Sequence, residues 1–166
     1  MPVPPSPINS ILFVCWGNIC RSPAAENMMR ALLERSGRSG IKCDSAGTLD
    51  AHAGSPPDPR MSEAGQRRGL PMTGQARCVR GEDFETFDLI LAMDRANWED
   101  LSQIAPRAES MNKVQLFCEY CTKHAEKEVP DPYYGGAQGF EHVLDLLEDG
   151  CQGILERVLG RNEGMS

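Results

Sequence analysis

Short apolar runs alternate along the chain with longer segments in which apolar residues recur at helical spacing. Four such runs predict strands, at Ile8–Cys15, Ile41–Ala46, Phe87–Met93 and Lys113–Phe117. The first and third are nearly continuous in apolar character, which is typical of strands buried on both faces. Strands that alternate with helices predict right-handed βαβ units. We therefore expect an α/β fold, with a parallel sheet covered by helices on both faces.

Signals for helix starts and ends place four helices after these strands. Ser22 is the expected N-cap of the first helix, Pro23 its first helical residue, and Gly37 its terminator. The other three are expected at Asp58–Gly69, from an Asp94 N-cap to about Ile104, and over the amphipathic stretch Phe140–Leu159. Ligands of parallel sheets bind beyond the carboxyl ends of the strands. The loop after Val14 is therefore the expected site.

That loop, residues 15–22 (CWGNICRS), combines a thiol at a strand end with an arginine just before a helix. A loop folded before a helix N-terminus points backbone N–H groups inward, and the helix dipole adds positive potential, so the loop favours anions. The same field favours a thiolate at Cys15. Arg21 can grip two phosphate oxygens through its planar guanidinium. The sequence therefore predicts a phosphate site, with Cys15 as nucleophile and Arg21 as phosphate clamp.

Other residues of the loop have expected supporting roles. Gly17 permits a positive φ or close backbone approach, and Asn18 tolerates a left-handed conformation and can brace the loop through its amide. Ser22 can donate a hydrogen bond to the thiolate when it leaves. The competing interpretation makes Cys15 and Cys20 small buried apolar residues with no chemical role. The strand before the loop and the helix start after it disfavour that interpretation.

Composition indicates a single domain and argues against some classes of partner. With 166 residues, 40% of them apolar, the chain suits a single domain at 8–160, after a flexible Pro-rich lead-in at 1–7 and before a flexible tail at 161–166. A net charge of −7 argues against nucleic acid as a partner, because phosphate backbones are bound through dense basic patches. Seven cysteines, without a signal-peptide or membrane-spanning pattern, predict a cytoplasmic protein with reduced thiols and no membrane partner. We also expect a monomer.

Residues 14–23 resemble the signature of the low-molecular-weight protein tyrosine phosphatases. The resemblance includes residues 44–48 (DSAGT), 87–94 and 131–135 (DPYYG), and covers nearly the whole chain after the Pro-rich start. It implies a four-stranded, Rossmann-like parallel sheet, hydrolysis of phosphotyrosine through a phosphocysteine intermediate, and no metal or other cofactor. Gly74 stands where animal members tend to have histidine, so the chain is more similar to the bacterial branch.

The resemblance also implies a proton donor and a pocket. Hydrolysis of a phosphate ester needs an acid for the leaving oxygen and then a base for water, and one carboxylate can serve both steps. In the family it is the Asp of the Asp-Pro-Tyr-Tyr motif, here Asp131, although an Asp-Pro pair is otherwise usually a turn. Tyr133 and Tyr134 are expected to wall the pocket, and Trp16 and Ile19 to line its entrance. Ile19 favours phosphotyrosine, because related arginine phosphatases typically have threonine there.

Three other cysteines are candidates for redox or metal sites. Cys20 is expected to line the substrate site and, under peroxide, to form a disulfide with Cys15 that protects the nucleophile. Cys118, Cys121 and His124 stand at successive spacings of three, but no second pair of ligands completes a zinc site. We expect these three to be core residues on one helical face.

Two other functions share parts of this pattern. A thiol-dependent arsenate reductase has the same fold and phosphate loop, but needs two further relay cysteines, and Cys78 stands alone in its region. A catalytically inactive phospho-binding module is disfavoured because the nucleophile, the arginine and the aspartate are all present.

The family pattern is not followed everywhere. Many members have an aromatic residue in the loop where this chain has residues 49–53 (LDAHA), so one pocket wall is expected to be thinner, with Trp16 compensating. His52 and His142 are expected to be surface or packing residues. Bacterial relatives often reverse tyrosine kinases of surface-polysaccharide export. A phosphotyrosine protein, such as a bacterial tyrosine kinase, is therefore the candidate partner.

Overall fold

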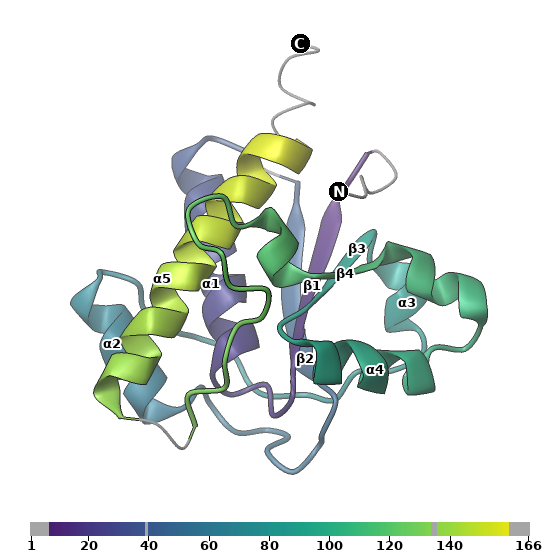
Figure 1. Cartoon of the computed structure of the whole chain (residues 1–166), viewed down its shortest axis with the longest axis horizontal. Helices are drawn as coiled ribbons and strands as arrows, with labels where there is room; N and C mark the ends of the chain where they lie inside the picture. Colours follow the sequence, from purple (N-terminus) through teal and green to yellow (C-terminus); the bar gives the residue numbers. More distant parts are fainter. Residues whose placement is uncertain (1–6, 39, 134–135, 160–166) are drawn as a thin grey trace.

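One parallel sheet lies at the centre of the protein in the computed structural model, which describes residues 7–38, 40–133 and 136–159 (Figure 1). Its strands are ordered β2-β1-β3-β4. Their bounds are Ser10–Cys15 for β1, Lys42–Gly47 for β2, Leu89–Ala92 for β3 and Val114–Leu116 for β4. The predicted four-stranded parallel sheet is confirmed. The expected lead-in, except residue 7, and the expected tail lie outside the described residues.

Helices cover both faces of this sheet, with α1, α2 and α5 on one side and α3 and α4 on the other (Figure 1). Their bounds are α1 Arg21–Arg35, α2 Pro59–Arg67, α3 Asp83–Thr86, α4 Arg95–Ile104 and α5 Ala137–Ile154, with 3-10 helices η1 at Ala108–Lys113 and η2 at Phe117–Tyr120. The side chains of β1 alternate between two cores. Ile11, Phe13 and Cys15 enter the core under α1 and α5, and Leu12 and Val14 enter the opposite core. Burial on both faces explains the apolar run.

The start of α1 differs from the prediction. The helix begins at Arg21, so its N-cap is Cys20 and not the expected Ser22. No side chain makes a capping hydrogen bond there. Ser22 is wrong as the cap because its hydroxyl oxygen lies 3.0 Å from the sulfur of Cys15. The hydroxyl therefore serves the loop instead of the helix end.

Other helix ends follow ordinary capping rules. Asp94 caps α4 as expected, since its carboxylate accepts the N–H of Asn97 at 2.8 Å in a capping box. Asp58 caps α2 by accepting the N–H of Arg60 at 2.8 Å. The closing helix is α-helical only to Ile154 and continues as a π-helical turn over Leu155–Leu159. Within the described residues, no helix is both long enough and apolar enough to cross a membrane.

The segment after β4 also differs from the prediction. Only the short 3-10 helix η2 forms there, so Cys118, Cys121 and His124 do not share a helical face. Cys118 is buried and Cys121 half-buried against the core, whereas the ring Nδ1 of His124 lies 2.7 Å from an oxygen of Asp149. In the part of the chain that the structure describes, no group of three or more His, Cys, Asp or Glu side chains is arranged to hold a metal ion.

Asp149 of α5 anchors this segment. Its buried carboxylate accepts the backbone N–H groups of Thr122, Lys123 and His124, each at 2.9 Å. Burial alone would raise the pKa of this carboxyl, but these hydrogen bonds and the His124 ring lower it to about 2. We expect Asp149→Asn to lower the free energy of unfolding at neutral pH by roughly 2 kcal/mol, the typical worth of hydrogen bonds to a charged group. Urea denaturation measures this loss.

The lowered pKa of Asp149 fixes the sign of the pH dependence. Its contribution is fully present above the ordinary pKa of 3.8 and is lost as the pH falls through about 2, so the gap between wild type and Asp149→Asn should close in that window. Asp145→Asn, one turn earlier and 51% exposed, is the matched control and should cost less than about 0.5 kcal/mol. Equal losses in the two variants would contradict the anchoring role.

Candidate active site

Cys15 ends β1 at the floor of a cavity of about 160 Å³. The chain turns at once after it, because Asn18 adopts a left-handed conformation with φ of 57°. The N–H of Asn18 then donates to the Cys15 sulfur at 3.3 Å. Helix α1 begins beside the same cavity, which Cys20 and Arg21 also line, so the positive end of its dipole lies there. Thiol, inward N–H and helix N-terminus thus meet in one place.

Arg21 is held rigidly beside this thiol. Its side chain is 2% exposed, and Nη1 donates to Asp94 Oδ2 at 2.7 Å and to the Val129 carbonyl at 2.9 Å. Burial alone would lower the pKa of Arg21, but Cys15, Asp94 and Asp131 together raise it, so the guanidinium stays charged. Two bonds on Nη1 fix the plane of the guanidinium. A ligand in the cavity therefore meets an arginine that needs no reorganisation.

Asp131 reaches the cavity from the loop before α5. Its side chain is 39% exposed, and Oδ1 accepts the backbone N–H of Tyr133 at 3.0 Å. The other oxygen, Oδ2, lies 3.6 Å from Nη2 of Arg21. One oxygen is thus oriented by the backbone, while the second lies beside the anion-binding arginine. A carboxyl in this position can exchange protons with solvent and with a group bound to Arg21.

The cavity wall contains most of the expected residues and some unexpected ones. Its lining residues are Cys15, Trp16, Gly17, Ile19, Cys20, Arg21, Leu49, Ala51, His52, Asp131 and Tyr133. Trp16 is 45% exposed, so it is a wall of the opening and not a core residue. Asn18 and Ser22 do not line the cavity but lie behind it. Tyr134 is outside the described residues.

His52 corrects one expectation. It was expected to be a surface or packing residue, but it lines the cavity, with 6.2 Å between the ring centroids of His52 and Tyr133. Its Cδ2 would lie only 3.0 Å from a Cβ at Gly17, so a glycine at that position lets the imidazole approach the loop. The wall expected to be thin is therefore supplied by an imidazole, in the loop where the family often has an aromatic ring. His142, by contrast, lies at the surface, with Nε2 2.8 Å from Glu126.

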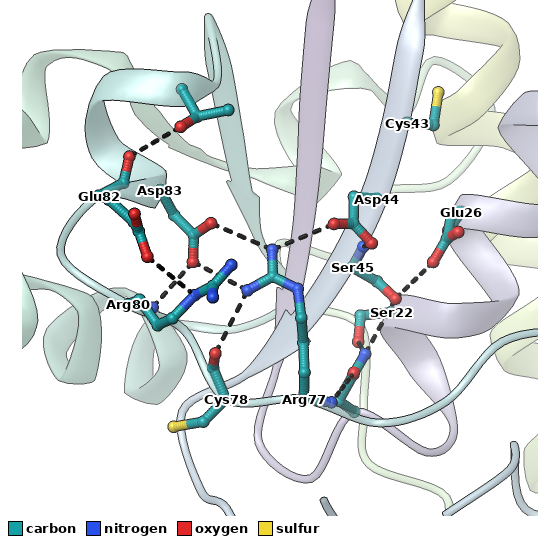
Figure 2. Close-up of polar contacts among 12 residues, drawn as sticks. Ser22, Glu26, Cys43, Asp44, Ser45, Arg77, Cys78, Arg80, Glu82 and Asp83 are labelled. Carbon is teal, nitrogen blue, oxygen red and sulfur yellow. Dashed lines mark hydrogen bonds and ion pairs between the residues drawn. The ribbon is translucent and has the colours of Figure 1, made fainter. Parts of the chain in front are cut away.

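A buried hydrogen-bond network braces the loop from behind (Figure 2). The Asn18 side-chain amide donates to the hydroxyl oxygens of Ser22 at 2.7 Å and Ser45 at 3.0 Å, and its oxygen accepts the backbone N–H of Arg77 at 2.9 Å. The hydroxyl of Ser45 donates to Glu26 at 2.6 Å. The left-handed turn is thus tied to α1, to β2 and to residue 77. Glu26 and Arg77 were not singled out from the sequence, and Ser45 was noted only within the stretch 44–48, because nothing local marks their contacts.

Arg77 fixes its own end of that network. Figure 2 shows its guanidinium between two carboxylates, with Asp83 of α3 on one side and Asp44 of β2 on the other. The ion pairs measure 3.0 Å to Asp83 and 3.1 Å to Asp44. Burial alone would lower the pKa of Arg77, and the two carboxylates raise it. The backbone N–H that holds Asn18 therefore belongs to a residue whose guanidinium is held by a carboxylate on either side.

Ser22 offers a measurable link between this network and the thiol. Because its oxygen accepts a hydrogen from Asn18, its own hydrogen is left for the Cys15 sulfur, 3.0 Å away. A hydrogen bond to a charged group contributes about 1.5–3 kcal/mol, so we expect Ser22→Ala to lower kcat about 10- to 100-fold with p-nitrophenyl phosphate. Ser10→Ala, at the other end of β1, is the control and should keep the wild-type kcat. An unchanged kcat in Ser22→Ala would contradict this role.

Cys20 stays a neutral thiol in this site. It lines the cavity, and its burial, with added repulsion from Asp58 and Cys15, raises the pKa of its thiol far above the ordinary value. It is therefore not a second nucleophile of the resting site. Its disulfide with Cys15 under peroxide stays a prediction.

The chain is similar to known proteins over nearly its whole length. Residues 10–163 match the family described as low molecular weight phosphotyrosine protein phosphatase. The chain is 52% identical over 146 residues to a putative low molecular weight protein-tyrosine-phosphatase of Synechocystis sp., covering 87% of this chain and 93% of the relative. A protein tyrosine phosphatase structure from Entamoeba histolytica with Hepes in the active site superposes with a TM-score of 0.86 at 40% identity, over 95% of this chain and 99% of that one. Vibrio vulnificus Wzb in complex with benzylphosphonate superposes with a TM-score of 0.77 at 31% identity, over 88% and 96%.

Proposed function

The chain belongs to the low molecular weight phosphotyrosine protein phosphatase family and is a protein-tyrosine phosphatase, a hydrolase of phosphomonoesters, and from this premise we propose that Cys15, Arg21 and Asp131 carry out the reaction. The observation that carries the assignment is their convergence: Cys15 and Arg21, at the two ends of one loop, and Asp131, from the distant loop before α5, line one small cavity. The thiol lies at its floor, and the guanidinium and the carboxyl lie 3.6 Å from each other.

In the first step, the Cys15 thiolate attacks the phosphorus of the bound ester. The bond between phosphorus and the ester oxygen breaks, and Asp131 donates its proton to the leaving oxygen. The products are a phosphocysteine and the free tyrosine hydroxyl. Arg21 and backbone N–H groups of the 15–22 loop bind the equatorial oxygens while negative charge spreads over them, which lowers the barrier.

In the second step, water attacks the phosphocysteine. The Asp131 carboxylate, now deprotonated, accepts a proton from the water, so one residue serves as acid and then as base. The sulfur–phosphorus bond breaks and inorganic phosphate leaves. The hydrogen bonds from the Asn18 N–H and the Ser22 hydroxyl stabilise the thiolate that is released.

The cavity walls favour an aromatic ester. Trp16 and Tyr133 are flat rings at the opening, and His52 lies beside them, so a phenyl ring can pack while its phosphate reaches the floor. Serine and threonine phosphates are too short to place their backbone at the rim. Ile19 offers an apolar side chain where a phosphoarginine guanidinium would need a polar partner. We therefore assign phosphotyrosine as the substrate group.

A phosphotyrosine-bearing protein is the partner that this site requires, and a bacterial tyrosine kinase is our candidate. The cytoplasm is the compartment we assign, because Cys15 must stay reduced to act as a nucleophile. Trapping from a lysate with Cys15→Ser, followed by mass spectrometry, tests the partner. Recovery without any phosphotyrosine protein would count against it.

The function is tested by comparing substrates on the purified chain. We expect phosphate release from a phosphotyrosine peptide and from p-nitrophenyl phosphate, little from phosphoserine or phosphoarginine peptides, and no arsenate reduction with thioredoxin. EDTA should leave the rate unchanged, since the proposed steps use only side chains and water. A higher rate with phosphoarginine, or arsenate reduction, would overturn the assignment.

A further inference from the structure

A second pair of cysteines lies in a tight turn after β4. Residues 118–121 read Cys-Glu-Tyr-Cys, and the N–H of Cys121 donates to the carbonyl of Cys118 at 3.1 Å, which closes a 3-10 turn. In a 3-10 helix, side chains three residues apart eclipse each other, and a rise of about 2 Å per residue separates their Cα atoms by about 6 Å. A disulfide needs Cα atoms about 4.4–6.8 Å apart. The turn therefore brings the two Cα atoms within the range that a disulfide spans.

We propose that Cys118 and Cys121 are a reversible dithiol oxidation site, distinct from the catalytic cavity, that closes to a disulfide with hydrogen peroxide or a small-molecule disulfide as oxidant. Neither residue lines the cavity. Cys121 is half-buried and Cys118 is 7% exposed, so the pair meets solvent on the side of Cys121. The two thiols thus lie in one turn at the edge of the core.

The chain on both sides of the pair is fixed, which favours the bridge. Phe117 is fully buried against Phe13, and the hydroxyl of Tyr120 donates to Gln115 at 2.7 Å. On the other side, Asp149 holds three successive backbone N–H groups. Ring closure therefore costs little additional chain entropy, because the turn is already formed.

The two thiols also influence each other directly. A hydrogen bond between them lowers the pKa of Cys118 and raises the pKa of Cys121. A hydrogen bond between the two thiols agrees with the turn, in which side chains three residues apart eclipse each other.

Oxidation by peroxide proceeds in two balanced steps. Peroxide oxidises one thiol of the pair to a sulfenic acid and is reduced to water. The sulfur of the other cysteine then attacks the oxidised sulfur, the S–O bond breaks, and the oxygen leaves as a second water that takes the proton of the attacking thiol. With a small-molecule disulfide, one cysteine first forms a mixed disulfide and releases one small thiol, and the other cysteine then displaces the second. Either route removes two electrons from the pair, and dithiothreitol returns them.

Other cysteines outside the cavity lack this combination of access and a partner in the same turn. Cys43 and Cys151 are buried, and burial raises the pKa of both thiols, that of Cys43 to about 12. Cys78 is half-buried, but no second cysteine lies near it in the sequence. Cys78 is therefore an internal control, since it can form a mixed disulfide but has no neighbour in its own segment to displace the adduct.

Peptide mapping of the intact protein tests the proposal. The folded chain is equilibrated with oxidised and reduced glutathione, quenched in acid, alkylated and cleaved with trypsin. Cleavage after Lys113 and Lys123 places Cys118 and Cys121 alone on peptide 114–123, while Cys15 and Cys20 share peptide 1–21. We expect peptide 114–123 to lose two hydrogen atoms and resist alkylation, and to recover both alkylation sites after dithiothreitol. Cys78 should carry glutathione under the same conditions.

Two results would overturn the proposal, both at a redox ratio that fully modifies Cys78. In the first, peptide 114–123 stays fully alkylated. In the second, it carries one glutathione on each cysteine. As a second measurement, Cys121→Ser should remove the internal bridge and leave Cys118 reduced, and Cys78→Ser should leave the bridge intact. A bridge that persists in Cys121→Ser would place its partner elsewhere and also overturn the proposal.

Discussion

Replacing Cys15 with serine is expected to abolish turnover and to leave phosphate binding intact. A serine hydroxyl is not ionised at neutral pH, so the attacking anion is lost, and loss of a nucleophile typically costs roughly 10⁴-fold or more in kcat. The binding groups are untouched, because Arg21 is held by Asp94 and Val129 and the Asn18 turn is held by its own network. Steady-state assays with p-nitrophenyl phosphate measure the first effect, and calorimetric titration with inorganic phosphate measures the second.

The matched control for this result is Cys78→Ser. It makes the same atomic change at a cysteine that does not line the cavity, and it should keep wild-type turnover. Residual turnover of Cys15→Ser close to that of Cys78→Ser would remove Cys15 from the mechanism. Loss of phosphate binding in a folded Cys15→Ser protein would show that the sulfur itself is needed to hold the anion.

The strands were predictable because their signal is local and strong. β1 is apolar on both faces, since helices cover both sides of the sheet, and its alternating side chains enter two separate cores. The start of α1 was not predictable in the same way. Capping preferences favour Ser22, but its hydroxyl is used by the Cys15 sulfur and the Asn18 amide, which only the folded loop brings within reach.

The prediction for the segment after β4 was wrong for a related reason. Spacings of three suggested one helical face for Cys118, Cys121 and His124, yet the helix ends after a single 3-10 turn. The backbone N–H groups that would continue it are taken by Asp149, which lies on a helix distant in the sequence. A long-range carboxylate thus overrode a local pattern, and the same interaction fixes the chain directly after the turn that contains the two cysteines.

Some residues of the site could likewise be predicted from a local pattern, and others could not. Cys15 and Arg21 could be proposed from one short segment, because the strand, the loop and the helix start are consecutive. Asp131 needed the resemblance, since an Asp-Pro pair alone is usually a turn. His52 was missed because its role depends on a tertiary approach to Gly17, which no local pattern encodes.

Asp131→Ala is expected to slow hydrolysis of aryl phosphates by about 10²–10⁴-fold, the usual contribution of a positioned acid. The carboxyl has one oxygen oriented by the Tyr133 N–H and the other beside Arg21, so it is placed to protonate an oxygen that leaves from the bound phosphate. The loss should depend on the leaving group. Phenyl phosphate releases a poor leaving group and should suffer most, whereas p-nitrophenyl phosphate releases a more stable anion and should suffer least.

Glu128→Gln is the matched control for that series. Glu128 belongs to the same loop, but its carboxylate accepts the backbone N–H of Arg95 at 2.7 Å and does not line the cavity. The Glu128→Gln variant should leave kcat unchanged with both esters. This control distinguishes a general disturbance of the loop from the loss of an acid. An equal loss with phenyl and p-nitrophenyl phosphate in Asp131→Ala would show that Asp131 positions the substrate instead of donating the proton. A normal rate with phenyl phosphate would transfer the proton donation to another group, because the poorer leaving group cannot depart at that rate without an acid.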